Sequence, residues 1–212
     1  MKRTSQIIGS GKFGIITRIF RNLKDYKSKS EFTKEYIIKT FSSQEELNNS
    51  LIIYNRLKNY AYIKNKIPRF YKKINSKQIA MPTLSNGVST FCVSISNEDS
   101  EDFISLKSLE IEQIFLSKDF LRSFYRINSI LFANKTFFPH DCYFFIFTYK
   151  LESKSVEIDY MIGDLDKIDF DHPNYKMNEW TNFILFRGSL LELLKKLEIN
   201  ENLISEVENE FN

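Results

Sequence analysis

The sequence predicts an α+β fold in which a small antiparallel sheet with one helix precedes a mostly helical part. Three observations support this class. First, three of the six glycines fall within residues 9–14, between two apolar segments, which is typical of a loop joining two strands. Second, two later segments have the composition or alternation of strands, 143–149 and 156–162. Third, three segments have the apolar spacing of helices, at about 109–133, 178–197 and 201–211.

The composition limits the classes of function. The chain has 212 residues, 42% of them hydrophobic and 27% charged, which indicates one large globular domain or two small lobes. Its net charge is only +3, and basic and acidic residues are interleaved, so nucleic acid is not expected as the main partner. Two cysteines and two histidines without ligand spacing argue against structural zinc and indicate a reducing compartment.

The sequence has no apolar leader segment at its N-terminus and no run of about 18 apolar residues. We therefore expect a soluble, cytoplasmic protein without a transmembrane segment, or one exported without a classical signal. Contact with a membrane surface is left open.

The glycine segment has the spacing Gly-x-Gly-x-x-Gly, formed by Gly9, Gly11 and Gly14. Apolar residues on both sides predict strand, loop, strand, and such a loop can offer backbone N–H groups to a triphosphate. No Gly-Lys-Ser/Thr follows, so it is not a Walker A motif. A strand and not a helix follows, which argues against a dinucleotide-binding fingerprint. The alternative interpretation is an ordinary glycine hairpin.

The sequence from residue 21 to residue 87 predicts the remaining secondary-structure elements of the first part. A polar loop is expected over 21–34 and a short strand over 35–41, which carries Lys39. Ser42 and Ser43 with Glu45 and Glu46 have capping-box spacing and predict a helix start, with one helix side formed by Leu47, Leu51, Tyr54 and Lys58. Further strands are expected at 67–71 and 78–81. Pro82 and the irregular segment 83–87 mark a domain boundary, which gives lobes of 1–84 and 85–212.

The second part begins with an acidic loop over 95–102. The helix expected over about 109–133 presents Phe120, Phe124, Ile127 and Leu131 on one face, with Asn134 as its C-cap. A turn at 137–142 contains His140 and Asp141 and precedes the two strands. Gly163, Asp164, Leu165 and Asp166 end the second strand, and Gly188 is a candidate break in the first closing helix.

In order, the chain reads as glycine loop, strand lysine, capped helix, connector, long helix, His-Asp turn, strand hairpin and Gly-Asp-x-Asp. This order resembles the protein-kinase fold over nearly the whole chain to about residue 171. The nearest likeness is to small bacterial kinase-like proteins of the YrbL type and to lipopolysaccharide-core sugar kinases. The resemblance implies a bilobal fold with an abbreviated, mostly helical C-terminal lobe.

The resemblance also implies a nucleotide site. Gly9, Gly11 and Gly14 would cover the phosphates of ATP, and Lys39 would contact the α- and β-phosphates. Met81 and Leu84, which border the connector, would contribute to the cofactor-binding site. For Lys39 the alternative is a solvated lysine at a strand end.

The same resemblance assigns three acids. Asp141 would accept or orient the proton of the attacking hydroxyl, with His140 as a structural support. Asp164 would bind Mg²⁺, with Asp166 as a second ligand. The alternatives are that Asp141 caps a turn and that the acidic segment is merely solvated.

Two positions depart from the kinase pattern. Ile146 stands where the catalytic loop should supply an asparagine, and Ser50 stands near the expected helix glutamate. Glu46 lies one turn earlier and could reach Lys39, or could serve only as a capping residue.

The sequence therefore favours an ATP- and Mg²⁺-dependent phosphotransferase that acts on a hydroxyl acceptor, either a sugar of a glycolipid or a protein Ser/Thr. The alternative is a pseudokinase that acts as a nucleotide-binding or regulatory module. A third hypothesis is an interaction protein in which the glycine loop is incidental.

Overall fold

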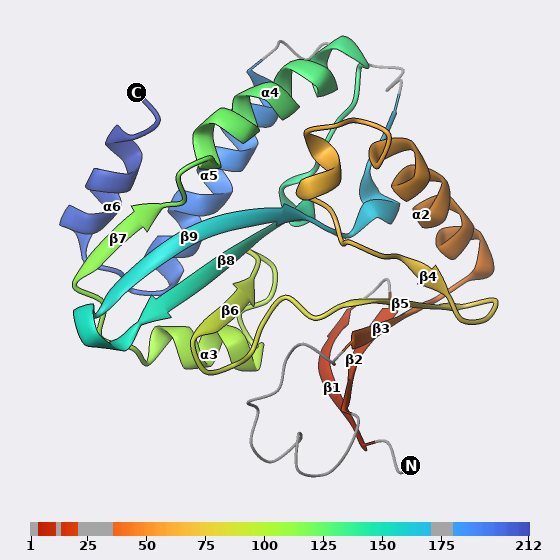
Figure 1. Ribbon diagram of the computed structural model, residues 1–212, viewed down its shortest axis with the longest axis horizontal. Helices are drawn as coiled ribbons and strands as arrows, with labels where there is room; N and C mark the ends of the chain where they lie inside the picture. Colours follow the sequence, from red (N-terminus) through yellow and green to blue (C-terminus); the bar gives the residue numbers. More distant parts are fainter. Residues whose placement is uncertain (1–3, 12–13, 21–35, 171–179) are drawn as a thin grey trace.

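The computed structural model describes residues 4–11, 14–20, 36–170 and 180–212 (Figure 1). These residues form two sheets and five α-helices, which confirms the predicted α+β class. Among these helices, none is long and apolar enough to cross a membrane.

The first sheet is antiparallel throughout and has the strand order β1-β2-β3-β5-β4. Its strands are β1 (Thr4–Gly11), β2 (Gly14–Phe20), β3 (Tyr36–Phe41), β4 (Lys72–Lys73) and β5 (Gln78–Pro82). The small N-terminal antiparallel sheet is thus confirmed. The predicted polar loop at 21–34 and residues 12–13 lie outside the described residues.

The prediction of a strand over 67–71 is wrong, because the strand in this part of the chain is β4, which lies later, at Lys72–Lys73. Pro68 offers no N–H to a sheet, and its carbonyl instead accepts a hydrogen bond of 3.1 Å from the Tyr54 hydroxyl on helix α2 (Gln44–Leu57). Ile67 and Tyr71 are buried in the core at this point. The segment is apolar because it packs under the helix and not because it pairs in a sheet.

Helix α2 starts where its capping residues predict. The Ser43 hydroxyl accepts a hydrogen bond of 3.1 Å from the Glu46 amide, and the Glu46 carboxylate accepts one of 3.2 Å from the Ser42 amide. The buried face is rotated slightly from the predicted one. Its members are Leu47, Ser50, Tyr54 and Leu57, while Leu51 is half-buried and Lys58 is exposed.

The second sheet has the order β6-β8-β9-β7. Its strands are β6 (Thr90–Val93), β7 (Gln113–Leu116), β8 (Tyr143–Lys150) and β9 (Ser155–Ile162). The predicted hairpin of β8 and β9 is confirmed. Strands β6 and β7 were not predicted, and β7 pairs parallel to β9.

Strand β7 corrects the predicted start of the long helix, because α4 spans Phe120–Ala133 and does not begin near Leu109. The amide of Ser117 donates a hydrogen bond of 2.8 Å to the carbonyl of Ile158, which extends the pairing with β9 up to the helix. Asn134 is the C-cap of α4, as predicted. The acidic segment 95–102 is a loop only up to Ser100, which caps helix α3 (Glu101–Lys107).

Two helices complete the chain, α5 (Thr181–Lys196) and α6 (Glu201–Asn209). Helix α5 runs through Gly188 without interruption, so the expected break is wrong. In Figure 1, α4 and α5 cover one face of the second sheet.

The many aromatic residues fill the space between this sheet and its helices. Phe186 on α5 is fully buried at the centre of a group of rings. Its ring centroid lies 3.8 Å from that of Phe124 in a stacked arrangement. Its other ring contacts come from α4, the sheet and the C-terminal segment: Phe120, Tyr143, Phe145, Tyr160 and Phe211. The second sheet, α4, α5 and the C-terminal segment therefore share one aromatic core.

Replacing Phe186 with Ala should lower the free energy of unfolding by about 3–5 kcal/mol, because the change leaves a cavity among these rings. Ile184→Ala is the control on the same helix, since Ile184 is 62% exposed. Urea unfolding followed by circular dichroism measures both. Equal losses for the two variants would contradict the central position of Phe186.

Candidate functional site

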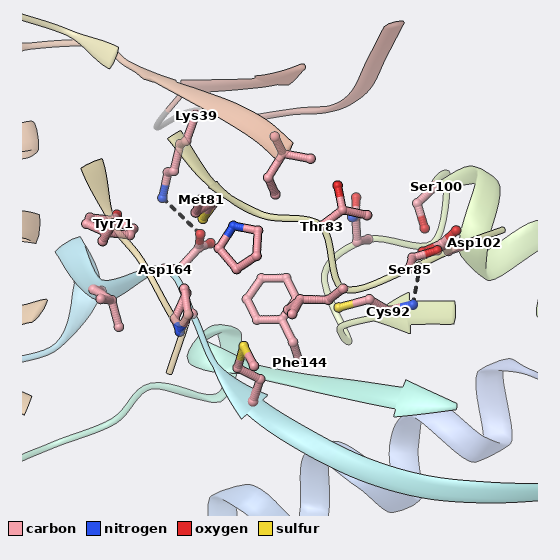
Figure 2. Close-up of a pocket in the computed structure, with 18 of the residues that line it drawn as sticks. Lys39, Tyr71, Met81, Thr83, Ser85, Cys92, Ser100, Asp102, Phe144 and Asp164 are labelled. Carbon is pink, nitrogen blue, oxygen red and sulfur yellow. Dashed lines mark hydrogen bonds and ion pairs between the residues drawn. The ribbon is translucent and has the colours of Figure 1, made fainter. Parts of the chain in front are cut away.

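A pocket lies between the first sheet and the β8–β9 hairpin (Figure 2). One end carries the charged groups of Lys39 and Asp164, and the other end carries Ser100 and Asp102. The wall between these ends is mostly apolar, with side chains from both sheets and from the segment that connects them: Ile37, Met81, Leu84, Phe144 and Met161. The predicted cofactor residues Lys39, Met81 and Leu84 thus line one pocket.

Lys39 is brought to this pocket by the alternation of strand β3. Ile37 and Lys39 are two residues apart, so both side chains lie on the same face of the strand. Only 5% of the surface of Lys39 is exposed. Its Nζ lies 2.9 Å from Asp164 Oδ1 and 2.8 Å from Asp166 Oδ1. Lys39 is therefore a buried, doubly paired cation and not a solvated lysine at a strand end.

Burial by itself would lower the pKa of Lys39, because a low-dielectric environment disfavours the charged ammonium. The charges of Asp164 and Asp166 outweigh that effect, and the pKa of Lys39 lies above its ordinary value. The side chain is thus a fixed positive charge at neutral pH.

Asp164 is placed by a tight turn after strand β9. Its backbone is left-handed, with φ of 43°, and the amide of Gly163 donates a hydrogen bond of 2.9 Å to the carbonyl of Cys142. A Cβ atom at Gly163 would lie 2.7 Å from the ring of Phe144, so only glycine fits here without movement of that ring. Leu165 is buried and anchors the 3₁₀ turn η5 (Leu165–Lys167). This turn directs both Asp164 and Asp166 towards Lys39.

Asp141 lies in the 3₁₀ turn η3 (His140–Cys142), just before strand β8. Its Oδ1 accepts a hydrogen bond of 2.8 Å from the Ser96 hydroxyl and lies 2.9 Å from His140 Nε2. Its Oδ2 lies 3.1 Å from Lys167 Nζ, and the same Nζ lies 3.3 Å from Asp164 Oδ2.

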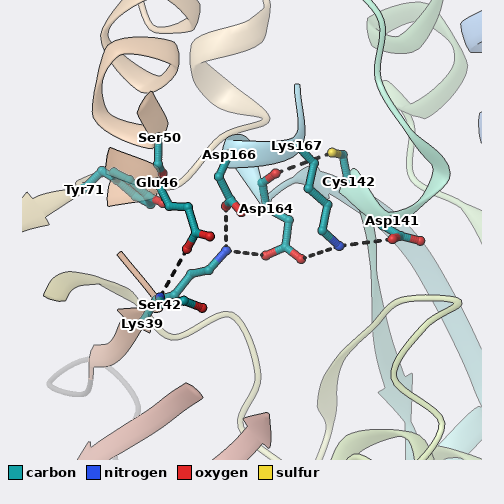
Figure 3. Close-up of polar contacts among 10 residues, drawn as sticks. All are labelled: Lys39, Ser42, Glu46, Ser50, Tyr71, Asp141, Cys142, Asp164, Asp166 and Lys167. Carbon is teal, nitrogen blue, oxygen red and sulfur yellow. Dashed lines mark hydrogen bonds and ion pairs between the residues drawn. The ribbon is translucent and has the colours of Figure 1, made fainter. Parts of the chain in front are cut away.

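These contacts form a continuous series of charges, Asp166, Lys39, Asp164, Lys167 and Asp141, which we call the charge chain (Figure 3). The sequence interpretation overlooked Lys167 and Ser96 as site residues. The spacing of Lys167, three residues after Asp164, was the available signal, because a helical turn places such residues side by side.

Asp141 has competing influences on its pKa. Partial burial raises the pKa, but hydrogen bonds from Ser96 and Lys167 outweigh burial, and the pKa of Asp141 is lowered from its ordinary value of 3.8. The carboxylate is therefore ionised at neutral pH and able to accept a hydrogen bond from a hydroxyl group.

The two positions that depart from the kinase pattern have structural roles. Ser50 is buried and shares a hydrogen bond with the Tyr71 hydroxyl. Glu46 completes the cap of α2, while the carboxylates bonded to Lys39 come from Asp164 and Asp166. Ile146 lies in β8, opposite Asp159 in the register, and supplies no polar atom for a metal.

The predicted glycines lie at the same end of the first sheet as Lys39. Gly9 pairs with Ile16, which in turn pairs with Lys39, and Gly11 pairs with Gly14 at the end of the hairpin. Residues 12–13, at the tip of the predicted loop, lie outside the described residues.

The oxygen ligands that the protein offers decide whether the expected magnesium ion fits this site. In the part of the chain that the structure describes, no three His, Cys, Asp or Glu residues are arranged to hold a metal ion. Asp164 and Asp166 are two carboxylates on one turn, with 24% and 5% of their side chains exposed. Mg²⁺ commonly takes one or two carboxylates together with phosphate oxygens and waters. The residues therefore fit a Mg²⁺ ion shared with a bound phosphate, and do not fit one held by protein alone.

No protein-family model matches the sequence, and no curated protein gives a significant match to it.

Replacing Lys39 with Met should lower the free energy of unfolding by about 3–5 kcal/mol, because Asp166 would be left buried without its cation. Adding Asp166→Asn should recover part of this loss, since the unpaired charge is removed. Urea unfolding of the two single variants and the double variant measures the coupling, with exposed Lys58→Met as the control. If the losses of unfolding free energy in the two single variants simply add up in the double variant, Lys39 and Asp166 do not interact.

Lys167→Met should raise the pKa of Asp141, because the variant loses a hydrogen bond and a nearby positive charge. A lowered carboxyl pKa contributes stability that is present above the ordinary value of 3.8 and is lost as pH falls through the folded value. The variant should therefore gain less stability from this carboxylate above pH 3.8, and the loss of that stability should be complete at a higher pH than in the wild type. Carboxyl NMR titration of Asp141 tests this, with Lys154→Met, which removes a cation paired with Glu110 and Glu112, as the control. If the pKa of Asp141 is unchanged in Lys167→Met, Lys167 is not the cause of its lowered value.

Proposed function

We propose that this protein is an ATP- and Mg²⁺-dependent phosphotransferase with a bilobal, protein-kinase-like arrangement, which transfers a γ-phosphoryl group to a hydroxyl acceptor. The observation that carries the proposal is the charge chain. It joins Lys39, Asp164 and Asp141, which are far apart in the sequence, and its Lys39–Asp164 pair lies at one end of a mostly apolar pocket.

The pocket supports an adenine nucleotide as the donor. Its apolar wall, which includes Ile37, Met81 and Phe144, suits a flat base, and such pockets commonly add a few polar groups that orient the ligand. Phosphates would lie at the Lys39 end, where the ammonium offsets their charge. The glycine hairpin lies at this same end of the sheet, as expected for a loop over phosphates.

The charged residues take separate roles in the proposed reaction. Asp141 orients the acceptor hydroxyl and takes its proton as the oxygen bonds to the γ-phosphorus and the bond to the β-phosphate oxygen breaks. Lys39 neutralises charge on the phosphates in the transition state. Asp164 would hold Mg²⁺ together with the phosphate oxygens, and the ion would supply further neutralisation of charge. Asp166, more deeply buried, keeps Lys39 in position.

A second candidate function is a pseudokinase that binds nucleotide without transferring phosphate. Ile146 in place of a polar ligand and the pairing of both Asp164 and Asp166 with Lys39 favour this alternative. The retention of Asp141 in contact with Lys167 favours the enzyme, because a binding module needs no proton acceptor there.

Nucleotide binding is tested by thermal unfolding with ATP. ATP with Mg²⁺ at about 100 times its Kd should stabilise the protein by about 2.7 kcal/mol, because it binds only the folded state. The Asp164→Asn variant should lose the portion of this stabilisation that depends on Mg²⁺. The Asp119→Asn variant, which changes an exposed carboxylate, is the control and should keep it. An increase in stability with ATP that does not depend on Mg²⁺ would support the pseudokinase. No increase in stability with ATP would support an interaction protein.

Catalysis is tested by release of ADP. Asp141→Asn should lower turnover by about 10²–10⁴-fold while the shift in Tm with ATP persists, because the variant removes the proton acceptor and not the nucleotide pocket. Equal turnover in the variant and the wild type would exclude Asp141 as the base.

A further inference from the structure

Helix α4 has an outer face that carries arginine and aromatic side chains. Tyr125 and Phe132 on this face are each 40% exposed, although both are large and apolar over most of their surface. The sequence of α4 contains no Asp or Glu, so the charge of the helix is positive. The exposed residues of α4 at helical spacing are Arg122, Tyr125, Arg126, Ser129, Phe132 and Ala133.

Rings on neighbouring elements continue this face on both sides of α4. Tyr125 stacks on Phe183 of α5 with ring centroids 5.4 Å apart, and Trp180, which directly precedes α5, lies edge-on to Phe183 at 5.7 Å. On the other side, the guanidinium of Arg126 lies 4.6 Å from the ring centroid of Tyr62. Trp180 is 49% exposed and Tyr62 is 45% exposed. The surface that we call the aromatic–arginine face consists of Tyr62, Arg122, Tyr125, Arg126, Phe132, Trp180 and Phe183.

The two arginines of this face lack acidic partners in the part of the chain that the structure describes. Arg187 on α5 pairs with Glu208, whereas no ion pair is found for Arg122 or Arg126 among the described residues. Arg122 and Arg126 are four residues apart on one helix, where like charges repel and slightly destabilise it. An anion bound from outside would relieve this repulsion. The planar guanidinium groups suit the oxygens of a phosphate group.

The shape of the aromatic–arginine face favours a lipid surface over a protein partner. Protein partners usually place an anchor side chain in a pocket, and none of these residues lines the nucleotide pocket or the cavity beside His140 and Gly188. Tryptophan and tyrosine favour the boundary between water and lipid, because one end of the side chain is apolar and the other is polar. Arginine beside them can reach the headgroup phosphates.

We propose that the aromatic–arginine face docks this protein on a membrane surface that contains anionic phospholipids. The arginines bind headgroup phosphates, and the exposed rings lie at the level of the headgroups. The opposite side of α4 stays in the protein core, so docking requires no change of fold. The face shares no residue with the nucleotide pocket, and the inference does not depend on the proposed phosphotransferase function.

The test uses the fluorescence of Trp180, which is the only tryptophan in the chain and lies in this face. The full chain is mixed with vesicles of phosphatidylcholine alone, or of an equimolar mixture of phosphatidylcholine and phosphatidylglycerol. With the anionic vesicles we expect a shift of the emission to shorter wavelength and protection from quenching by acrylamide. Added salt should reverse both effects, because it screens the attraction between the arginines and the lipids.

Two double variants locate the contact, with binding measured by co-sedimentation with the anionic vesicles. Arg122→Gln with Arg126→Gln should lower the partition coefficient roughly 25-fold, at about fivefold for each basic residue near the lipid. This variant should fold, because both side chains are exposed and their mutual repulsion is removed. The matched control is Lys72→Gln with Lys73→Gln, which removes the same charge from exposed residues of β4 and should change the coefficient by less than about twofold.

Three results would overturn the proposal. The first is no change of Trp180 emission with the anionic vesicles, and the second is equal binding to neutral and anionic vesicles. The third is an equal loss of binding in the two double variants, because the vesicles would then respond to net charge and not to this face. A change of Trp180 emission with poly-L-glutamate but not with vesicles would assign the face to an acidic protein and exclude the lipid.

Discussion

The ion pairs of Lys39 with Asp164 and Asp166 are the interaction on which the arrangement of this site depends. An ammonium taken out of water is unfavourable unless anions replace its hydration, and here the replacement comes from residues more than a hundred positions later in the chain. The pairs therefore tie the first sheet to the turn that follows the second sheet. Displacement of one sheet from the other would separate the Lys39 ammonium from both carboxylates, so these pairs hold the pocket between the sheets in one geometry.

A second set of contacts supports this junction from the side of α2. The amide of Ile162 donates a hydrogen bond of 2.6 Å to the carbonyl of Lys66, and the Lys66 ammonium pairs with Asp159 on β9. The guanidinium of Arg56 on α2 lies 3.8 Å from the ring centroid of Phe170. Helix α2 thus packs against the segment that carries Asp164, and this segment supplies both carboxylates that pair with Lys39. The helix fixes the position of the turn, and the turn fixes the lysine.

Local patterns in the sequence predicted local features well. Ser43 and Asn134 cap their helices, and the alternation of residues 156–162 gives strand β9, because caps and alternation depend on neighbours in the chain. Strand β7 was missed because its four residues are defined by parallel pairing with β9, about forty positions later. The role of Ser96 was missed for the same reason, because it is given by a contact with Asp141 that composition and spacing do not encode. For Lys167 a signal was present in its spacing from Asp164, and only its contact with Asp141 depends on the fold.

The replacement of the expected helix acid has a consequence for the proposed chemistry. In this chain the partner of Lys39 and the candidate metal ligand belong to one turn, Asp164 to Asp166, and Glu46 serves the helix cap. The deeply buried Asp166 would keep its contact with Lys39 when phosphate arrives, whereas the more open Asp164 would be free to exchange the lysine for a magnesium ion. Lys167 would meanwhile hold Asp164 and Asp141 at a fixed separation. The lysine, the metal ligand and the proton acceptor would then be positioned by one short segment, so assembly of the site would require no movement of helix α2.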